Sequence, residues 1–332
     1  MQNFAVIGSG AWGTALAQCI NRGGQKVCLW AREKEVVDCI LKNSENKRFL
    51  PGVSLDKKIV ATNDINQALK GANAVLIVVP AQFFRATCIS LRPIISTNIP
   101  VVICTKGIEV KSGLLMSEVC ASILPQNPVA ILSGPTFAQE VALGLPTAVT
   151  LACRNPKLKQ KLIKPLKECG LRPYGSEDVI GAEIGGAVKN IIAIASGITI
   201  GRKLGDNARA ALISRGFAEI SRLAEAKGGD TETLAGLCGI GDLLLTCTSL
   251  QSRNFSLGVK LGKGEKLSNI LSKTEAVTEG VASAKAVVTL AKKCQVEMPI
   301  STAIAEILNE ECEIDEVIER LLLRPLSKDQ SC

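Results

Sequence analysis

The sequence predicts an α/β protein with a doubly wound, mostly parallel sheet in residues 1–180 and an all-helical C-terminal domain in residues 181–332. Short runs rich in Val and Ile recur along the first part and alternate with helix-like segments, as a parallel sheet buried on both faces requires. A glycine-rich turn directly follows the first of these runs. After Tyr174 the apolar residues recur only with a helical period.

The first strand and the turn after it form a candidate nucleotide-binding motif. Residues 4–13 read F-A-V-I-G-S-G-A-W-G, and Thr14–Ile20 is typical of a helix. Gly8 permits the tight turn, Gly10 lets the backbone approach a pyrophosphate, and Gly13 lets helix and strand pack closely. A bare glycine pattern also occurs in incidental turns, but this context favours a Rossmann-type dinucleotide site.

Arg32 follows the second apolar run, Lys26–Trp30, where many NAD enzymes have an acidic residue that binds the adenosine ribose. An arginine at this place can pair with a 2′-phosphate, which favours NADP or the use of both cofactors. The neighbouring Glu33 weakens that inference. A surface arginine without a ligand is the alternative.

Polar residues end two of the later strands. Lys106 lies in Thr105-Lys106-Gly107, and residues 133–138 read S-G-P-T-F-A. Since ligands of open parallel sheets bind beyond the carboxyl ends of the strands, Lys106 is a candidate cation at the cofactor crevice. A lone lysine after a strand is more often a surface residue. The later strands are expected at Ile59–Thr62, Ala74–Val79, Val101–Thr105, Val129–Leu132 and Thr147–Cys153, with a short final strand from Arg172.

The second domain is expected to be a helical bundle. Lys189 is the only charged residue in residues 184–201, which are apolar on nearly every side. A lone ammonium is costly to bury unless it is paired or used, and Asp242 lies in a similar apolar segment. A purely structural pair of these two residues is the alternative to a catalytic one. The helices are expected at residues 207–227, 231–237, 274–294, 300–310 and 314–323.

Composition excludes several classes of function. The net charge is +8, but the lysines are dispersed and aromatic residues are only 3%, which argues against nucleic-acid binding and favours a basic surface that attracts phosphorylated metabolites. The chain has no histidine, and its 13 cysteines form no C-x-x-C pair. We therefore expect buried reduced thiols, no metal site and no catalytic cysteine.

The first 21 residues carry no charged side chain and resemble a secretory signal. Gly8, Gly10 and Gly13 interrupt the apolar run that such a signal needs, so a cytoplasmic protein is expected. The apolar stretches at residues 74–84 and 190–201 are shorter than the roughly 20 residues of a membrane span. No transmembrane helix is predicted.

Seven short motifs occur in order along the chain: G-S-G-A-W-G-T-A (8–15), T-K-G (105–107), S-G-P-T-F-A-Q-E (133–140), G-G-A-V-K-N (185–190), G-I-G-D-L (239–243), S-R-N (252–254) and T-E-G (278–280). Together they resemble the NAD(P)-dependent glycerol-3-phosphate dehydrogenases of the bacterial type. The resemblance implies an oxidoreductase that interconverts dihydroxyacetone phosphate and sn-glycerol 3-phosphate with NADP or NAD and supplies glycerol 3-phosphate for phospholipid synthesis. It also implies that the protein is a homodimer and that its substrate is a small phosphorylated triose. Neither nucleic-acid binding nor a membrane span is implied.

The resemblance further implies site residues. Lys189 is the expected general acid/base, and Asp242, Asn190, Thr246 and Lys106 are its polar neighbours around the reacting carbon. The expected substrate ligands are Lys106, Gly134, Thr136, Lys189, Asp242, Ser252, Arg253 and Asn254. The expected cofactor ligands are Gly8, Ser9, Gly10, Ala11, Trp12, Gly13, Arg32, Lys106, Ala138, Arg253, Val277 and Glu279.

Two other classes of protein fit part of the pattern. Reductases of the 6-phosphogluconate or β-hydroxyacid dehydrogenase type also pair a Rossmann domain with a helical one and use a lysine followed by asparagine. The S-R-N and G-P-T-F-A segments favour the glycerol phosphate family over them. A nucleotide-binding sensor without chemistry is expected to have gaps at Lys106, Lys189 or Asp242, and all three residues are present.

Overall fold

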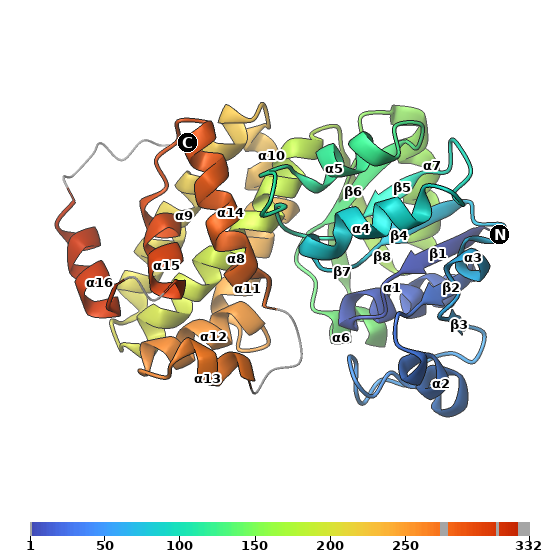
Figure 1. Ribbon diagram of the computed structural model, residues 1–332, viewed down its shortest axis with the longest axis horizontal. Helices are drawn as coiled ribbons and strands as arrows, with labels where there is room; N and C mark the ends of the chain where they lie inside the picture. The colour runs from blue at the N-terminus through green and yellow to red at the C-terminus, as the bar shows by residue number, and fades with distance from the viewer. Residues whose placement is uncertain (1, 273–277, 310–311, 325–332) are drawn as a thin grey trace. The chain divides into compact units, whose positions relative to one another are not determined.

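The computed structural model describes residues 2–272, 278–309 and 312–324 and divides into two compact units (Figure 1). The first unit contains the chain up to residue 106 together with residues 116–179. The second contains residues 107–115 and the chain from residue 180 onward. The segment 107–115, which the sequence pattern assigns to the first domain, therefore groups with the second unit. An isolated antiparallel bridge between Ile108 and Leu115 closes this segment into a loop.

The described part of the first unit contains an eight-stranded sheet in the order β3-β2-β1-β4-β5-β6-β7-β8 (Figure 1). All neighbouring strands are parallel except β6 and β7, which pair antiparallel through Ile131 opposite Ala152. The order reverses between β1 and β4, the kind of position where such sheets bind ligands. The strands are β1 Asn3–Ile7, β2 Lys26–Trp30, β3 Val60–Thr62, β4 Ala74–Ile77, β5 Val101–Ile103, β6 Val129–Ser133, β7 Thr147–Ala152 and β8 Leu171–Ser176.

The predicted doubly wound, mostly parallel sheet is confirmed. Its central strands are fully buried, as the continuous Val and Ile runs require; Val6 and Val75 have no exposed surface. The helices between the strands are α1 Ala11–Arg22, α2 Lys34–Asn43, α3 Ile65–Leu69, α4 Ala81–Leu91, α5 Met116–Ile123, α6 Ala138–Leu143 and α7 Pro156–Glu168. The first of them begins at Ala11, earlier than the predicted Thr14, because Gly10 is its N-cap.

The second unit is helical, and no strand occurs among the described residues after Ser176. Its helices are α8 Val179–Gly201, α9 Asp206–Ala226, α10 Thr231–Ala235, α11 Asp242–Thr248, α12 Arg253–Gly262, α13 Leu267–Ser272, α14 Glu279–Lys293, α15 Pro299–Leu308 and α16 Ile314–Leu322. A π-helical turn, Leu237–Gly241, joins α10 to α11. The sequence pattern missed α11, α12 and α13 as helices, although α11 contains the predicted site residues Asp242 and Thr246 and α12 contains Arg253 and Asn254.

Helix α8 is the central helix of the second unit. It has 23 residues and a mean hydropathy of 1.5, so by length and composition it is long enough to cross a membrane. The apolar stretch 190–201 alone predicted a helix too short for a membrane span. That length was wrong, because the helix begins eleven residues before Asn190. The apolar window of α8 is 89% buried inside the structure. Such burial is typical of the core helix of a helical domain.

Candidate active site

The glycine-rich loop after β1 has the geometry of a dinucleotide-binding turn. Gly8 has a φ of +119°, and a Cβ there would lie 2.6 Å from the Val78 carbonyl oxygen. A Cβ on Gly13 would lie 1.8 Å from the Gly8 carbonyl oxygen. A Cβ on Gly10, in contrast, would meet nothing within 4 Å. Gly8 and Gly13 are therefore required by the turn and its packing on α1, whereas Gly10 leaves open space beside the helix N-terminus.

The N-terminus of α1 fits an anionic group. Its N-cap Gly10 makes no side-chain capping hydrogen bond, and its first turn contains no acidic residue. The Trp12 Nε1 atom is buried without a hydrogen-bond partner among the described residues. Backbone N–H groups at a helix start favour negative charge through the helix dipole. This end of α1 is therefore suited to a dinucleotide pyrophosphate.

Lys106 and the start of the 134–138 segment lie at the same edge of the sheet, where β5 and β6 end. The Lys106 Nζ atom donates to the Gly134 carbonyl oxygen at 3.1 Å, and the Thr136 hydroxyl donates to the same oxygen at 3.3 Å. Gly134 has a φ of +143°, a conformation that favours glycine. Thr105 Oγ1 donates to the Val79 carbonyl oxygen at 2.8 Å and so joins the ends of β4 and β5. The predicted residues Lys106, Gly134 and Thr136 thus form one cluster.

Three predicted residues meet in the core of the second unit. The Lys189 Nζ atom on α8 donates to Asp242 Oδ1 at 2.5 Å and to Thr246 Oγ1 at 2.8 Å. The exposed fractions are 7% for Lys189, 1% for Asp242 and 6% for Thr246. The Thr246 hydroxyl also donates to the Asp242 carbonyl oxygen at 2.6 Å, which fixes its rotamer. A buried ammonium is thereby held at one point by two oxygen acceptors.

The local sequence explains the position of Asp242. Asp242 is the first residue of α11, where the helix dipole favours a carboxylate. The preceding π-helical turn needs a glycine, because a Cβ on Gly239 would lie 1.9 Å from the Leu234 carbonyl oxygen. Such π-helical turns are often found at functional sites.

The thiol of Cys247 lies in the same electrostatic environment. Burial raises the pKa of Cys247 to about 12, Lys189 lowers it and Asp242 raises it. The thiol therefore stays protonated near neutral pH and cannot act as a nucleophile. Its proximity to Lys189 and Asp242 was not predicted from the sequence, since a cysteine in an apolar helix gives no signal for such a neighbour.

Asn190 belongs to a second network beside this cluster. Asn254 Nδ2 on α12 donates to Asn190 Oδ1 at 3.0 Å, and the Gly280 backbone N–H donates to Asn254 Oδ1 at 3.0 Å. These bonds join α8, α12 and the start of α14. Ser252 is the N-cap of α12, where its hydroxyl accepts from the Phe255 N–H at 3.2 Å. Arg253 begins the helix and is exposed.

Close glycine contacts set the spacing of α8 and α12. A Cβ on Gly197 would lie 2.1 Å from the Phe255 carbonyl oxygen, and a Cβ on Gly258 would lie 2.1 Å from the Ile194 carbonyl oxygen. Gly201 and Gly262 repeat the contact one turn further along each helix. The two helix backbones therefore touch, which places Asn254 within hydrogen-bond distance of Asn190. The pattern G-x-x-x-G in both helices was an unused sequence signal for this contact.

The other predicted cofactor residues lie apart in the chain. Arg32 is paired with Glu33 at 2.7 Å after β2, and Ala138 is the first residue of α6. Desolvation lowers the pKa of Arg253, and the charge of Glu279, the first residue of α14, opposes this shift without reversing it. Val277 lies outside the described residues. Among the described residues, no group of three or more His, Cys, Asp or Glu side chains could hold a metal ion.

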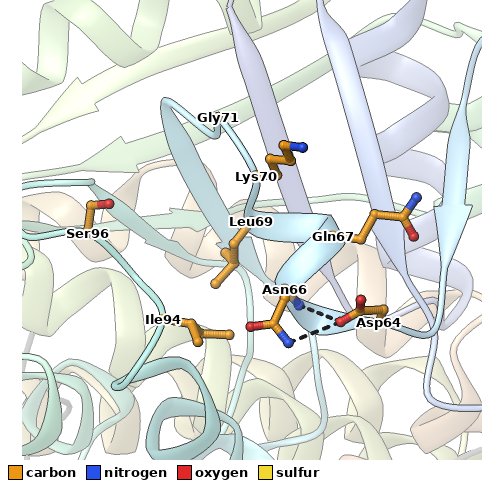
Figure 2. A pocket seen from close by; sticks show the side chains of 8 residues that line it. All are labelled: Asp64, Asn66, Gln67, Leu69, Lys70, Gly71, Ile94 and Ser96. Carbon is orange, nitrogen blue, oxygen red and sulfur yellow. Dashed lines mark hydrogen bonds between the residues drawn. The ribbon is translucent and has the colours of Figure 1, made fainter.

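A pocket of about 600 Å³ lies in the first unit beside α3, as Figure 2 shows. Asp64 caps α3 by accepting hydrogen bonds from the backbone N–H and side chain of Asn66 at 2.9 and 3.2 Å. The pocket is lined by Asp64, Asn66, Gln67, Leu69, Lys70, Gly71, Ile94 and Ser96. It contains none of the predicted site residues.

Comparison with known proteins agrees with the motif pattern. The model for the N-terminal part of NAD-dependent glycerol-3-phosphate dehydrogenases matches residues 3–159, and the model for their C-terminal part matches residues 178–319. The chain is 55% identical over 326 residues to glycerol-3-phosphate dehydrogenase [NAD(P)+] of Rhodospirillum rubrum, covering 98% of this chain and 93% of the relative. A second such relative, from Parvibaculum lavamentivorans, is 51% identical over 328 residues, covering 99% of this chain and 98% of the relative.

The fold agrees as well. The crystal structure of glycerol-3-phosphate dehydrogenase from Coxiella burnetii superposes with a TM-score of 0.94 at 42% identity, covering 97% of this chain and 99% of that one. A ketopantoate reductase from Ralstonia eutropha shares the fold alone, with a TM-score of 0.61 at 18% identity over 95% of this chain and 99% of that one. The family matches cover most of both units, and on that basis the chain belongs to the NAD-dependent glycerol-3-phosphate dehydrogenase family.

Proposed function

We propose that this protein interconverts dihydroxyacetone phosphate and sn-glycerol 3-phosphate with NADPH or NADH, and so supplies glycerol 3-phosphate for glycerophospholipid synthesis. The main support from the geometry is the buried ammonium of Lys189, held by Asp242 and Thr246. A chain without histidine needs another proton donor for carbonyl reduction, and lysine is suited to that role.

The proposed mechanism assigns proton transfer to Lys189. The nicotinamide supplies a hydride to the carbonyl carbon of the substrate. Lys189 gives a proton to the carbonyl oxygen, and its positive charge stabilises the alkoxide that develops there. Asp242 and Thr246 hold the Nζ atom in one orientation. In the oxidative direction the same nitrogen, as a neutral amine, takes the proton from the substrate hydroxyl.

Substrate binding is proposed to depend on the start of α12. The Arg253 guanidinium matches the oxygens of a phosphate dianion, and the exposed position of Arg253 leaves it accessible to a ligand. Asn254 is held in place by Asn190 and the Gly280 N–H, so its position does not depend on ligand. We assign Lys106, Gly134 and Thr136 to the substrate as well. Ser252 is assigned to the substrate on the family resemblance, and the capping bond from the Phe255 N–H holds its hydroxyl at the start of α12.

Cofactor binding is proposed for the first unit and catalysis for the second, with the division at residues 180 and 181. The open space at Gly10 and the uncapped start of α1 support pyrophosphate binding by residues 8–13. Arg32 is assigned to the adenosine ribose. We assign Ala138, Lys106, Arg253, Val277 and Glu279 to the rest of the cofactor on the family resemblance.

The same resemblance is the basis for proposing a cytoplasmic homodimer. Light scattering coupled to size-exclusion chromatography measures the molar mass in solution. A mass near 35 kDa, that of one chain, contradicts the dimer.

A spectrophotometric assay tests the reaction, substrate and cofactor together. Purified protein is mixed with dihydroxyacetone phosphate and with NADPH or NADH in parallel, and the loss of reduced-nicotinamide absorbance is followed. Oxidation that depends on dihydroxyacetone phosphate supports the proposal. Oxidation that instead depends on a 2-oxo or β-oxo acid supports the hydroxyacid dehydrogenase alternative and refutes the proposal.

A further inference from the structure

The segment 107–115, which we call the strap, is anchored in the core of the second unit. Ile108 and Leu115, near its two ends, have no exposed surface and belong to the hydrophobic core of that unit. The bridge between them brings the two ends of the strap side by side. Val110 and Lys111 lie between the ends and are exposed. The strap is therefore a closed loop with buried ends and an accessible middle.

Hydrogen bonds hold the middle of the strap in one conformation. The Gly113 backbone N–H donates to the Glu109 carbonyl oxygen at 2.8 Å, and the Glu109 N–H donates to the Leu114 carbonyl oxygen at 3.0 Å. The Ser112 hydroxyl donates to Glu109 Oε2 at 2.5 Å and accepts from the Leu114 N–H at 3.1 Å. Glu109 is only 6% exposed, so its carboxylate depends on such donors. Ser112 thus fixes both the backbone and the buried carboxylate of the strap.

Lys293, the last residue of α14, fastens the strap from outside. Its Nζ atom donates to the Ser112 carbonyl oxygen at 3.0 Å, and a Cβ on Gly113 would lie 3.4 Å from the same nitrogen. In the first turn of α14, the Gly280 N–H donates to Asn254, a proposed substrate ligand. One helix therefore contacts the strap with its last residue and the proposed phosphate site with its first turn. None of the sequence motifs includes Ser112 or Lys293.

Lys106 directly precedes the strap, and its backbone is held on both sides. On the amino side the Thr105 hydroxyl donates to the Val79 carbonyl oxygen at 2.8 Å. On the carboxyl side only Gly107 separates Lys106 from the buried Ile108, and two residues span at most about 7 Å. Gly107 has a φ of +142°, so this joint favours a residue without a Cβ. The position of the strap therefore limits where the Lys106 backbone can lie.

We propose that Ser112 and Lys293 are positioning residues for Lys106, an inference that rests on the proposed function and deepens it. The proposed function assigns Lys106 to the substrate, and Ser112 and Lys293 act without touching that ligand. They keep the strap in one conformation, and the strap restricts the backbone of Lys106 from its carboxyl side. Less freedom of Lys106 is then lost when the substrate binds, and its ammonium is oriented before the hydride is transferred.

Hydrogen exchange followed by mass spectrometry tests the hold of Lys293 on the strap without substrate or cofactor. Lys293→Met removes the donor to the Ser112 carbonyl oxygen and leaves the buried ends of the strap in place. Peptides that cover residues 104–115 are expected to exchange about tenfold faster than in wild type, because a hydrogen bond from a charged donor is lost. Lys111→Met is the matched control, because Lys111 is exposed in the same strap and carries the same charge. Its exchange should stay within about twofold of wild type.

Steady-state kinetics tests the consequence for the substrate. In Lys293→Met and in Ser112→Ala, kcat/KM for dihydroxyacetone phosphate is expected to fall about tenfold. This loss is smaller than the roughly hundredfold effect of a shift of about 1 Å, because Ile108 and Leu115 still anchor the strap. Lys293→Arg keeps a donor and should restore most of the activity. Lys111→Met should stay within about twofold of wild type.

A double-mutant cycle separates positioning from a general loss of stability. If Lys293 acts through Lys106, Lys293→Met lowers kcat/KM about tenfold in wild type and leaves it unchanged in a Lys106→Met background. A general loss of stability instead lowers kcat/KM by the same factor in both backgrounds. The residual activity of Lys106→Met is measured at high enzyme concentration for this comparison.

Any one of four results overturns the proposal: unchanged exchange of residues 104–115 in Lys293→Met, unchanged kcat/KM in the same variant, an equal loss in Lys111→Met, or losses that multiply in the double variant. Failure of the proposed function is recognised separately, because the exchange rates are measured without turnover. A wild-type protein that does not oxidise NADPH with dihydroxyacetone phosphate contradicts the reaction, and the exchange rates still decide whether Lys293 holds the strap.

Discussion

The close contact between α8 and α12 predicts that one added methyl group impairs substrate binding from a distance. In Gly258→Ala the new Cβ would lie 2.1 Å from the Ile194 carbonyl oxygen, whereas ordinary contact begins at 3.4 Å. The helices must therefore separate locally by about 1.3 Å, because the opposing atom is backbone and cannot rotate away. Asn254 lies one helical turn before Gly258, so the same movement stretches its 3.0 Å bond to Asn190 beyond hydrogen-bond distance.

The magnitude follows from this displacement. A shift of about 1 Å in a substrate-positioning group costs about a hundredfold in rate. Overpacking costs about 1–3 kcal/mol of folding free energy, of which the higher helix propensity of alanine offsets about 1 kcal/mol. We therefore expect a folded protein whose kcat/KM for dihydroxyacetone phosphate falls by about a hundredfold.

Steady-state kinetics and calorimetry measure the two parts of this expectation. The kcat/KM for unphosphorylated dihydroxyacetone should fall less than that for its phosphate, since the displaced helix start is the proposed phosphate site. The affinity for NADP should stay near wild type, because its proposed ligands lie mainly in the first unit. Lys260→Ala, on the exposed face of the same helix, controls for helix propensity and should have little effect. A folded Gly258→Ala protein with kcat/KM within about threefold of wild type would refute the reasoning, since a shift of this size should cost far more.

Three further predictions concern individual side chains. Lys189→Met should lower turnover by about a thousandfold or more while calorimetry shows unchanged NADP affinity; near-normal turnover contradicts the proton-transfer role. Arg253→Ala should raise KM for dihydroxyacetone phosphate much more than for dihydroxyacetone, and equal effects on both substrates exclude the phosphate contact. Burial raises the pKa of Glu219, although hydrogen bonds from Ile300 and Ser301 oppose the shift. The stability that Glu219 contributes is therefore fully present below its ordinary pKa of 4.5, and it is lost as the pH rises through the raised pKa. Urea denaturation should therefore show that Glu219→Gln becomes more stable relative to wild type between pH 4.5 and pH 8, and a pH-independent difference is the opposing result.

The features that the sequence predicted correctly follow from local chemistry. Burial on both faces requires continuous apolar strands, and the predicted run Ala74–Val79 contains β4, in which all four residues are buried. Gly8 and Gly13 were predicted from the turn and the helix packing that they permit, and both have contacts that exclude a Cβ. The pairing of Lys189 with Asp242 could be foreseen because an isolated charge in an apolar helix needs a partner of opposite charge.

The features that were missed depend on contacts between distant parts of the chain. Apolar periodicity does not give the direction of a strand, so the antiparallel pairing of β6 with β7 was not foreseen. Helices α11 and α12 are only seven and ten residues long, too short for a clear period. The segment 107–115 follows a strand of the first unit but packs with the second, and nothing in its own sequence indicates that grouping. Asn46 donates hydrogen bonds to Ser9 and Thr14, more than thirty positions away, and a single asparagine in a loop gives no such signal.

The energetics of the Lys189–Asp242 pair favour a chemical role over a structural one. A buried ion pair contributes little net stability, because the desolvation of both charges offsets their attraction, and apolar residues of similar volume are often as stable. Loss of only one partner, in contrast, leaves a buried charge and costs about 3–5 kcal/mol. The helix around Lys189 is otherwise uncharged from Ile184 to Gly201 and packs through glycines against α12, so its packing does not require a charge. An ammonium at this position, oriented by Asp242 and Thr246, therefore fits the proton-transfer role that we propose for Lys189.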